Sequence, residues 1–158
     1  MKIKIAWIGK TKEPALQELT TEYLKRIQRY VPVEGLTVPD ENALLQFAGR
    51  SASSKTGHPK SKPVGGKSTL ILMDSRGEQF SSEEFADFLR NYQDRNPLPL
   101  IFAVGPADGF SDFARNSAQH TISLGKMTLP HELARVALLE QIYRAFTIIK
   151  GHPYHSGH

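Results

Sequence analysis

Apolar and polar positions alternate along this chain in two rhythms. Short apolar runs of the kind that form buried strands occupy residues 3–8, 31–38, 68–73, 98–104 and 121–124. Between these runs, apolar side chains recur every three or four positions, which is typical of helices with one buried face. This spacing predicts helices over residues 13–30, 42–50 and 81–92, a short helix from Ser111, and a long final helix opened by Pro130.

The alternation of strands and helices predicts an α/β fold, in which a mostly parallel sheet is covered by helices. Ligands in such folds bind at the carboxyl ends of the strands. With 158 residues, we expect residues 1–158 to form a single domain. Residues 51–67 break the pattern, because they are rich in Ser, Gly, Lys and Pro and contain no acidic residue. We interpret them as a flexible basic loop, and a basic arm that contacts phosphates is the alternative.

Composition narrows the function classes. The chain has no cysteine, which excludes disulfides, thiolate nucleophiles and cysteine-based metal sites. Its apolar runs are too short to cross a membrane, so we expect no membrane partner. Lysines interrupt the opening segment, so we expect no signal sequence and a cytoplasmic location. The net charge of +4 and the pI of about 9.4 permit an RNA partner without demonstrating one.

The last third of the chain carries polar groups that suit a ligand. A glycine-bearing turn follows the fifth predicted strand, and His131 and Arg135 stand at the start of the helix that comes next. Because they are four residues apart, these two basic side chains share a face of that helix. They suit an anionic or polar ligand. The alternatives are a capping role for His131 and an ion pair between Arg135 and Glu132 or Glu140.

Three other patterns are weaker. Residues 65–68, Gly-Gly-Lys-Ser, resemble the end of a phosphate-binding loop, but Ser61 stands where that motif needs glycine, and a strand follows instead of a helix. Residues 105–109, Gly-Pro-Ala-Asp-Gly, fit either a plain turn or a backbone lip for a nucleoside-like ligand. The histidines of the terminal segment have no carboxylate among them, so we expect a solvated tail and no metal site; they are His152, His155 and His158.

Several of these stretches occur together in the order of a known family. The segment 105–109, the run Ser-Leu-Gly-Lys-Met-Thr-Leu-Pro-His at 123–131, Arg135, the stretch Glu-Gln-Ile-Tyr-Arg-Ala at 140–145 and a terminal Pro-Tyr-His at 153–155 closely resemble the ribosomal RNA large subunit methyltransferase H family. That family belongs to the SPOUT class. The resemblance implies a homodimeric enzyme that uses S-adenosylmethionine to methylate N3 of a pseudouridine in large-subunit (23S) ribosomal RNA, on the assembled ribosome. It also implies a trefoil knot in the C-terminal part of the fold.

The resemblance assigns site residues as well. The positions that match the cofactor-binding ones of the family are Met73, Gly105, Leu124, Gly125, Lys126, Met127, Thr128 and Leu129. Methylation at N3 requires loss of the N3 proton and stabilisation of the anion that develops. The candidates for this catalytic work are His131, Arg135, Tyr154 and His155, and we expect the tail to act on the RNA side and not in the core. The alternatives are a SPOUT enzyme that acts on transfer RNA and a ribosome-associated binding protein without catalysis.

Overall fold

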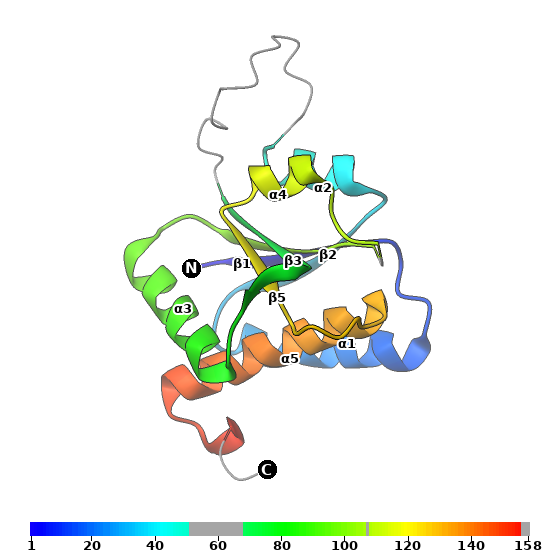
Figure 1. The fold of residues 1–158 in the computed structure, drawn as a ribbon. Coiled ribbons are helices and arrows are strands. Elements are labelled where there is room, and N and C mark those ends of the chain that lie inside the picture. Colours follow the sequence, from blue (N-terminus) through cyan, green and yellow to red (C-terminus); the bar gives the residue numbers. More distant parts are fainter. Residues whose placement is uncertain (51–67, 107, 156–158) are drawn as a thin grey trace.

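The computed structural model describes residues 1–50, 68–106 and 108–155. The predicted basic loop at 51–67 lies outside the described residues. So do the first three residues of the Gly-Gly-Lys-Ser stretch at 65–68. The strands form one sheet in which every pairing is parallel, in the order β2-β1-β4-β3-β5 (Figure 1). They are β1 (Ile3–Ile8), β2 (Val33–Val38), β3 (Thr69–Gln79), β4 (Leu100–Val104) and β5 (His120–Ser123).

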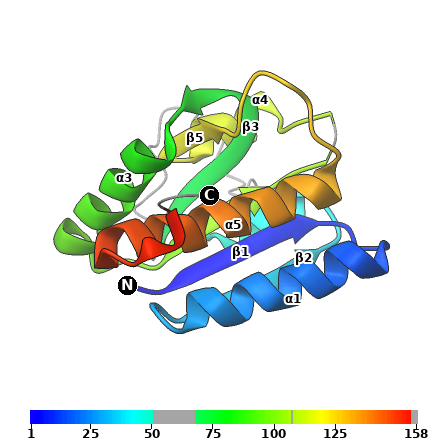
Figure 2. The ribbon, with the colours of Figure 1, turned by 90° about the horizontal axis from the view of Figure 1, so that it is seen from below.

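Helices cover both faces of this sheet, as the sequence pattern predicts. They are α1 (Pro14–Gln28), α2 (Glu41–Phe47), α3 (Ser82–Arg95), α4 (Asp112–Ser117) and α5 (His131–Lys150), followed by the short 3-10 helix η1 (Pro153–His155). Figures 1 and 2 show α1, α3 and α5 on one face, with α1 and α5 side by side, and α2 and α4 on the other. Each face has its own core. One is centred on Phe102, Leu139 and Phe146, and the other on Leu44, Leu72 and Ala103.

Local chemistry explains where several helices begin and end. The side chains of Ser81 and Glu84 form a reciprocal capping box at the start of α3, which satisfies backbone N–H groups that have no partner within the helix. The Ser111 hydroxyl accepts a hydrogen bond from Ala114 N and so begins α4. At its other end, α5 closes on Gly151, whose φ of 70° is a left-handed conformation that glycine adopts without steric cost.

The third strand is longer than predicted, since β3 continues to Gln79 instead of ending at Met73. Its register against β5 shifts between Met73 and Glu78, so residues 74–77 form a bulge, which we call the β3 bulge. A Cβ atom on Gly77 would lie 2.6 Å from the backbone carbonyl carbon of Thr121, and this close approach requires glycine. The hydrophobic pattern ended the strand too early because the residues after Met73 are polar while their backbone still pairs with β5.

Within the described residues, no helix combines the length and the apolar character needed to span a membrane.

Candidate functional site

The carboxyl ends of β4 and β5 and the β3 bulge meet around a cavity of about 180 Å³. The β3 bulge forms one wall, the β4–α4 loop (residues 105–111) forms a second, and the loop between β5 and α5 (residues 124–130) forms a third. This is the edge of a parallel sheet where ligands are expected. The cavity lies there because β4 and β5 end at this edge and β3, which continues past it, bulges between them.

Most residues expected to bind a cofactor surround this cavity. Its walls include Met73, Gly105, Leu124, Gly125, Met127, Thr128 and Leu129. Lys126 is an exception, because it is exposed and does not line the cavity. Gly105, Pro106, Asp108 and Gly109 form part of the wall, and Gly109 N donates to Pro106 O at 3.0 Å. The segment is therefore a turn that lines the cavity, and its role as a lip for a ligand stays a prediction.

The β5–α5 loop presents apolar side chains to solvent. Leu124 and Leu129 are both exposed, and Met127 is 86% exposed. Ser123 holds the start of the loop, because its hydroxyl accepts a hydrogen bond from Gly125 N at 3.0 Å and donates one to Gly125 O at 2.8 Å. The φ of 141° at Gly125 favours glycine there. The loop therefore has a defined conformation and leaves apolar surface for a ligand to cover.

A buried carboxylate joins two walls of the cavity. Asp74, which is 7% exposed, accepts hydrogen bonds from the Arg76 side chain and from the backbone N–H groups of Arg76 and Phe110. The Arg76 side chain in particular holds the pKa of Asp74 well below its usual range, although burial alone would raise it. Arg76 Nη2 also donates to Phe110 O at 3.1 Å. The hydrophobic pattern did not indicate this pair, because the apolar run ends at Met73. An Asp-x-Arg-Gly sequence after a buried strand is the signal that could have identified it.

Gly105 is tightly packed within the cavity wall. A Cβ atom at this position would lie 2.8 Å from the ring of Phe110, which is buried. Packing against Phe110 therefore disfavours any side chain here, while the expected part of Gly105 in cofactor binding stays a prediction.

The basic pair at the start of α5 is split by the structure. His131 lines the cavity, whereas Arg135 does not. Arg135 is 1% exposed, and its guanidinium donates to the backbone oxygens of Ile8 and Gly9 and to the hydroxyl of Thr11. Burial lowers the pKa of Arg135.

The expected role of Arg135 at the ligand is thus corrected. Its long side chain extends under the helix to the end of β1, where backbone carbonyl groups need donors. Among the described residues it forms no ion pair with Glu132 or Glu140 either. Neither the ligand contact nor the ion pair considered from the sequence therefore predicted its hydrogen-bond partners. Arg135 acts as a structural link between α5 and β1.

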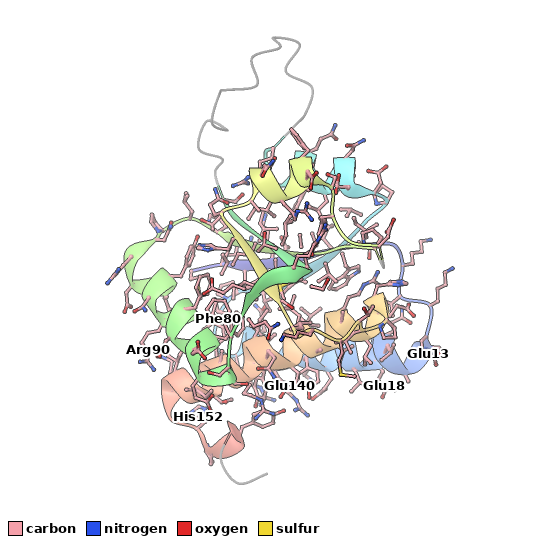
Figure 3. The ribbon with its side chains drawn as sticks, viewed as in Figure 1. Glu13, Glu18, Phe80, Arg90, Glu140 and His152 are labelled. Atoms are coloured by element: carbon pink, nitrogen blue, oxygen red, sulfur yellow. The ribbon has the colours of Figure 1, made fainter. Side chains whose placement is uncertain are left out.

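The tail packs against the protein instead of standing free. The Tyr154 ring lies edge-on to Tyr143 with centroids 4.7 Å apart, its hydroxyl donates to Glu140 at 3.3 Å, and the Arg144 guanidinium lies over its ring. Burial raises the pKa of Tyr154. His152, expected in a solvated tail, is hydrogen-bonded to the hydroxyl of Tyr30; Figure 3 shows His152 and Glu140 on this part of the molecule.

Within one chain, the candidate catalytic residues do not form one cluster. His131 is the first residue of α5, and Tyr154 and His155 follow its last turn. A helix of 20 residues is about 30 Å long, so Tyr154 lies far from the cavity wall that contains His131. No group of three or more His, Asp or Glu residues in the described parts of the chain is arranged to hold a metal ion.

A second hollow adjoins the cavity and shares Met73, Ser123, Leu124 and Leu129 with it. We call it the apolar groove. It runs between α1, α3 and α5, and the other residues that line it include Leu19, Tyr23, Phe80, Leu133, Val136 and Gln141. Leu19 and Leu133 are 42% and 41% exposed, so the groove leaves leucine side chains uncovered on a helical face.

Comparisons with known proteins identify the family of this chain. Residues 1–155 match the family model described as "Predicted SPOUT methyltransferase". The chain is 52% identical over 158 residues to the ribosomal RNA large subunit methyltransferase H of Koribacter versatilis, with all of both chains covered. It is 44% identical over 155 residues to the protein of the same name from Geobacter sp. strain M21, covering 98% of this chain and 99% of the relative.

A solved structure resembles the fold. It is that of a probable methylase family protein from Haemophilus influenzae, with a TM-score of 0.56 and 13% sequence identity. The match covers 98% of this chain and 70% of the other. At that identity, the likeness concerns the fold alone.

Proposed function

The chain belongs to the SPOUT methyltransferase family, and on that premise we propose that it methylates N3 of a pseudouridine in large-subunit ribosomal RNA, on the assembled ribosome, with S-adenosylmethionine as methyl donor. The observation that carries the proposal is the 52% identity, over the whole chain, to a ribosomal RNA large subunit methyltransferase H. The cavity between the β3 bulge and the ends of β4 and β5 supports it, because it offers one site where a cofactor and a base can meet.

The residues around the cavity fit S-adenosylmethionine. The exposed side chains of Leu124, Met127 and Leu129 provide apolar surface for an adenosine group, and the backbone of the β4–α4 loop supplies polar groups beside it. When bound, the cofactor supplies a methyl group on a positively charged sulfur. Residues 124–129 exclude water from that group. Lys126, which does not line the cavity, would contribute through its backbone position in the same loop.

His131 is the side chain best placed to accept the N3 proton. It lines the cavity, so an imidazole nitrogen can accept the proton while the nitrogen lone pair attacks the methyl carbon. The N–H bond would break and its proton would pass to the imidazole. The N–CH₃ bond would form as the sulfur–methyl bond breaks, and its electron pair would leave on the sulfur of S-adenosylhomocysteine. Loss of the proton and attack are thereby coupled at one end of α5.

We further propose a homodimer formed through the apolar groove. Exposed leucines along α1 and α5 would be covered by a second copy, and an ordinary interface buries roughly 800 Å² on each partner. Tyr154 and His155, which lie far from His131 in their own chain, would then act at the RNA-facing side of a partner's cavity. We also propose that residues 1–158 form a single domain and that its C-terminal part contains a trefoil knot, as the family resemblance implies.

Labelled cofactor and three RNA samples test the proposed function. Ribosomes that lack the modification, free 23S ribosomal RNA and transfer RNA are incubated with the protein, and digested RNA is analysed by mass spectrometry. We expect 3-methylpseudouridine from ribosomes. Methyl transfer to transfer RNA alone would instead support the transfer RNA enzyme, and ribosome binding without cofactor binding would support a non-catalytic protein.

The same assay tests the base. His131→Gln should reduce methyl transfer by about 100-fold or more, in line with the usual contribution of a general base. The matched control is His120→Gln, because His120 is exposed and lies at the opposite end of β5. Equal activity of the two variants would remove His131 from the chemistry.

A further inference from the structure

We propose that Arg76 and Asp108 bind the zwitterionic amino-acid end of the cofactor, with Arg76 on its carboxylate and Asp108 on its ammonium group. This inference rests on the proposed function, because it takes S-adenosylmethionine as the ligand. It adds Arg76, which neither the sequence motifs nor the family resemblance had included, and it gives Asp108, within the segment 105–109, a specific role.

Arg76 is held in place while one nitrogen of its guanidinium, Nη1, stays available. Nε and Nη2 donate to Asp74, and Nη2 also donates to Phe110 O. Nη1 has no hydrogen-bond partner among the described residues, and the side chain is 55% exposed. The β3 bulge places this side chain on the cavity wall, a use of bulges that recurs beside functional sites. The result is a guanidinium whose orientation is set before any ligand binds.

A second charge of opposite sign stands close by in the same wall. Asp108 is exposed, lines the cavity and makes no hydrogen bond or ion pair with any residue that the structure describes. It directly precedes Gly109, where an added Cβ atom would lie 3.3 Å from Arg76 Nη2. The Arg76 guanidinium and the unpaired carboxylate of Asp108 therefore belong to one short stretch of wall around Gly109.

The positive charge of Arg76 and the negative charge of Asp108 together indicate which chemical group of a ligand binds here. A guanidinium edge suits a carboxylate or a phosphate equally well. A phosphate of the RNA would be repelled by Asp108, whereas an α-amino acid offers a carboxylate and an ammonium group a few ångströms apart and satisfies both side chains. The facing wall, formed by residues 124–129, is apolar and leaves the adenosine group on that side.

Titration calorimetry with three ligands separates these contacts. The ligands are S-adenosylmethionine, its decarboxylated analogue, and 5′-methylthioadenosine, which lacks the whole amino-acid end. Arg76→Gln should weaken S-adenosylmethionine on the order of 10-fold and leave the other two ligands unchanged. Asp108→Asn should weaken both ligands that carry the ammonium group by roughly 3- to 5-fold and leave 5′-methylthioadenosine unchanged.

Matched controls come from an exposed ion pair outside the cavity. Arg90→Gln and Asp87→Asn remove the same charges from α3, where Figure 3 shows Arg90 at the outer edge of the molecule. Arg76→Lys adds a variant that keeps the charge beside Asp74 but loses the planar donor edge. 5′-Methylthioadenosine reports on the integrity of the cavity in every variant.

Each of the following outcomes would overturn the inference. Equal weakening of all three ligands by Arg76→Gln would assign Arg76 to cavity structure alone. Unchanged cofactor affinity with a higher KM for ribosomes would assign it to an RNA phosphate. Unchanged affinity in both variants would remove both residues from cofactor binding while the proposed function stands. A wild-type protein that binds none of the ligands would overturn the proposed function, and this inference with it.

Discussion

Arg76 donates two parallel side-chain hydrogen bonds to Asp74, from Nε to Oδ1 at 3.0 Å and from Nη2 to Oδ2 at 2.9 Å. Asp74 is buried while Arg76 is half exposed, so the pair joins the end of a core strand to the surface of the cavity. Asp74 also accepts from Phe110 N at 3.3 Å, which connects the β3 bulge to the β4–α4 loop. Two walls of the site therefore depend on one carboxylate.

Replacing this carboxylate should destabilise the protein in a pH-dependent way. The pKa of Asp74 is lowered by folding, so its stabilising contribution is complete above the unfolded pKa of about 3.9 and is lost as pH falls towards the folded pKa. We expect Asp74→Asn to reduce the free energy of unfolding by about 1–3 kcal/mol at pH 7, and by less at pH 3. Urea unfolding at both pH values measures this. A loss of the same size at both would contradict it, and exposed Asp87→Asn is the control.

Arg135 should matter for stability and not for chemistry. Arg135→Met leaves the oxygens of Ile8 and Gly9 without their donor in a buried place, which should cost about 2–4 kcal/mol of unfolding free energy. Arg135→Lys keeps a charged donor and should recover part of that loss. Urea unfolding and methyl-transfer assays are run on both variants. Wild-type stability of Arg135→Lys together with a 100-fold loss of activity would restore a catalytic role.

Gly105 and Phe110 should be energetically coupled. A Cβ atom at residue 105 meets the Phe110 ring at 2.8 Å, so Gly105→Ala should cost about 1–3 kcal/mol through overpacking. Phe110→Leu creates space at that point. The double variant should therefore be more stable than the sum of the two single losses, as a double-mutant cycle of unfolding free energies would show. Strict additivity would mean that the glycine is needed for another reason.

Removal of the tail should affect both activity and stability. Deleting residues 154–158 should abolish methylation of ribosomes, and it should also lower the melting temperature, because the Tyr154 ring packs on Tyr143. Tyr154→Phe separates the two effects: it keeps the ring contact, worth about 0.5–1.5 kcal/mol, and removes only the hydroxyl. We expect near wild-type stability for Tyr154→Phe, measured by thermal melting. Wild-type methylation by the truncated protein would exclude the tail from function.

The apolar groove supplies a test of the dimer. Leu133→Glu places a charge on the exposed part of the groove and should yield a 17.6 kDa monomer in sedimentation at micromolar concentration, while the wild type sediments as a dimer. Leu98→Glu is the matched control, because Leu98 is also an exposed leucine, at 37%, but lies outside the groove. A monomeric wild type, or equal behaviour of the two variants, would contradict the proposed interface.

Hydrophobic spacing determined the order of the strands and helices along the chain and the parallel sheet that they form. These features follow from local periodicity, since a strand or helix must bury its apolar side wherever it packs. The capping box at Ser81 and Glu84 was also predictable, because the residues that form it are three positions apart. The segment 123–131 pointed to the cavity for the same reason, as its turn and helix start are local features.

Only the tertiary structure decided the partners of the charged side chains. Arg135 and Ile8 lie 127 positions apart in the sequence, and Asp74 and Phe110 lie 36 apart, so no local pattern could show that they are joined. The strand beyond Met73 was hidden for a similar reason: its polar residues belong to β3 through backbone pairing with β5, which periodicity of side chains does not report. A long charged side chain can reach several surroundings from one backbone position, and the fold selects the one that satisfies buried polar groups.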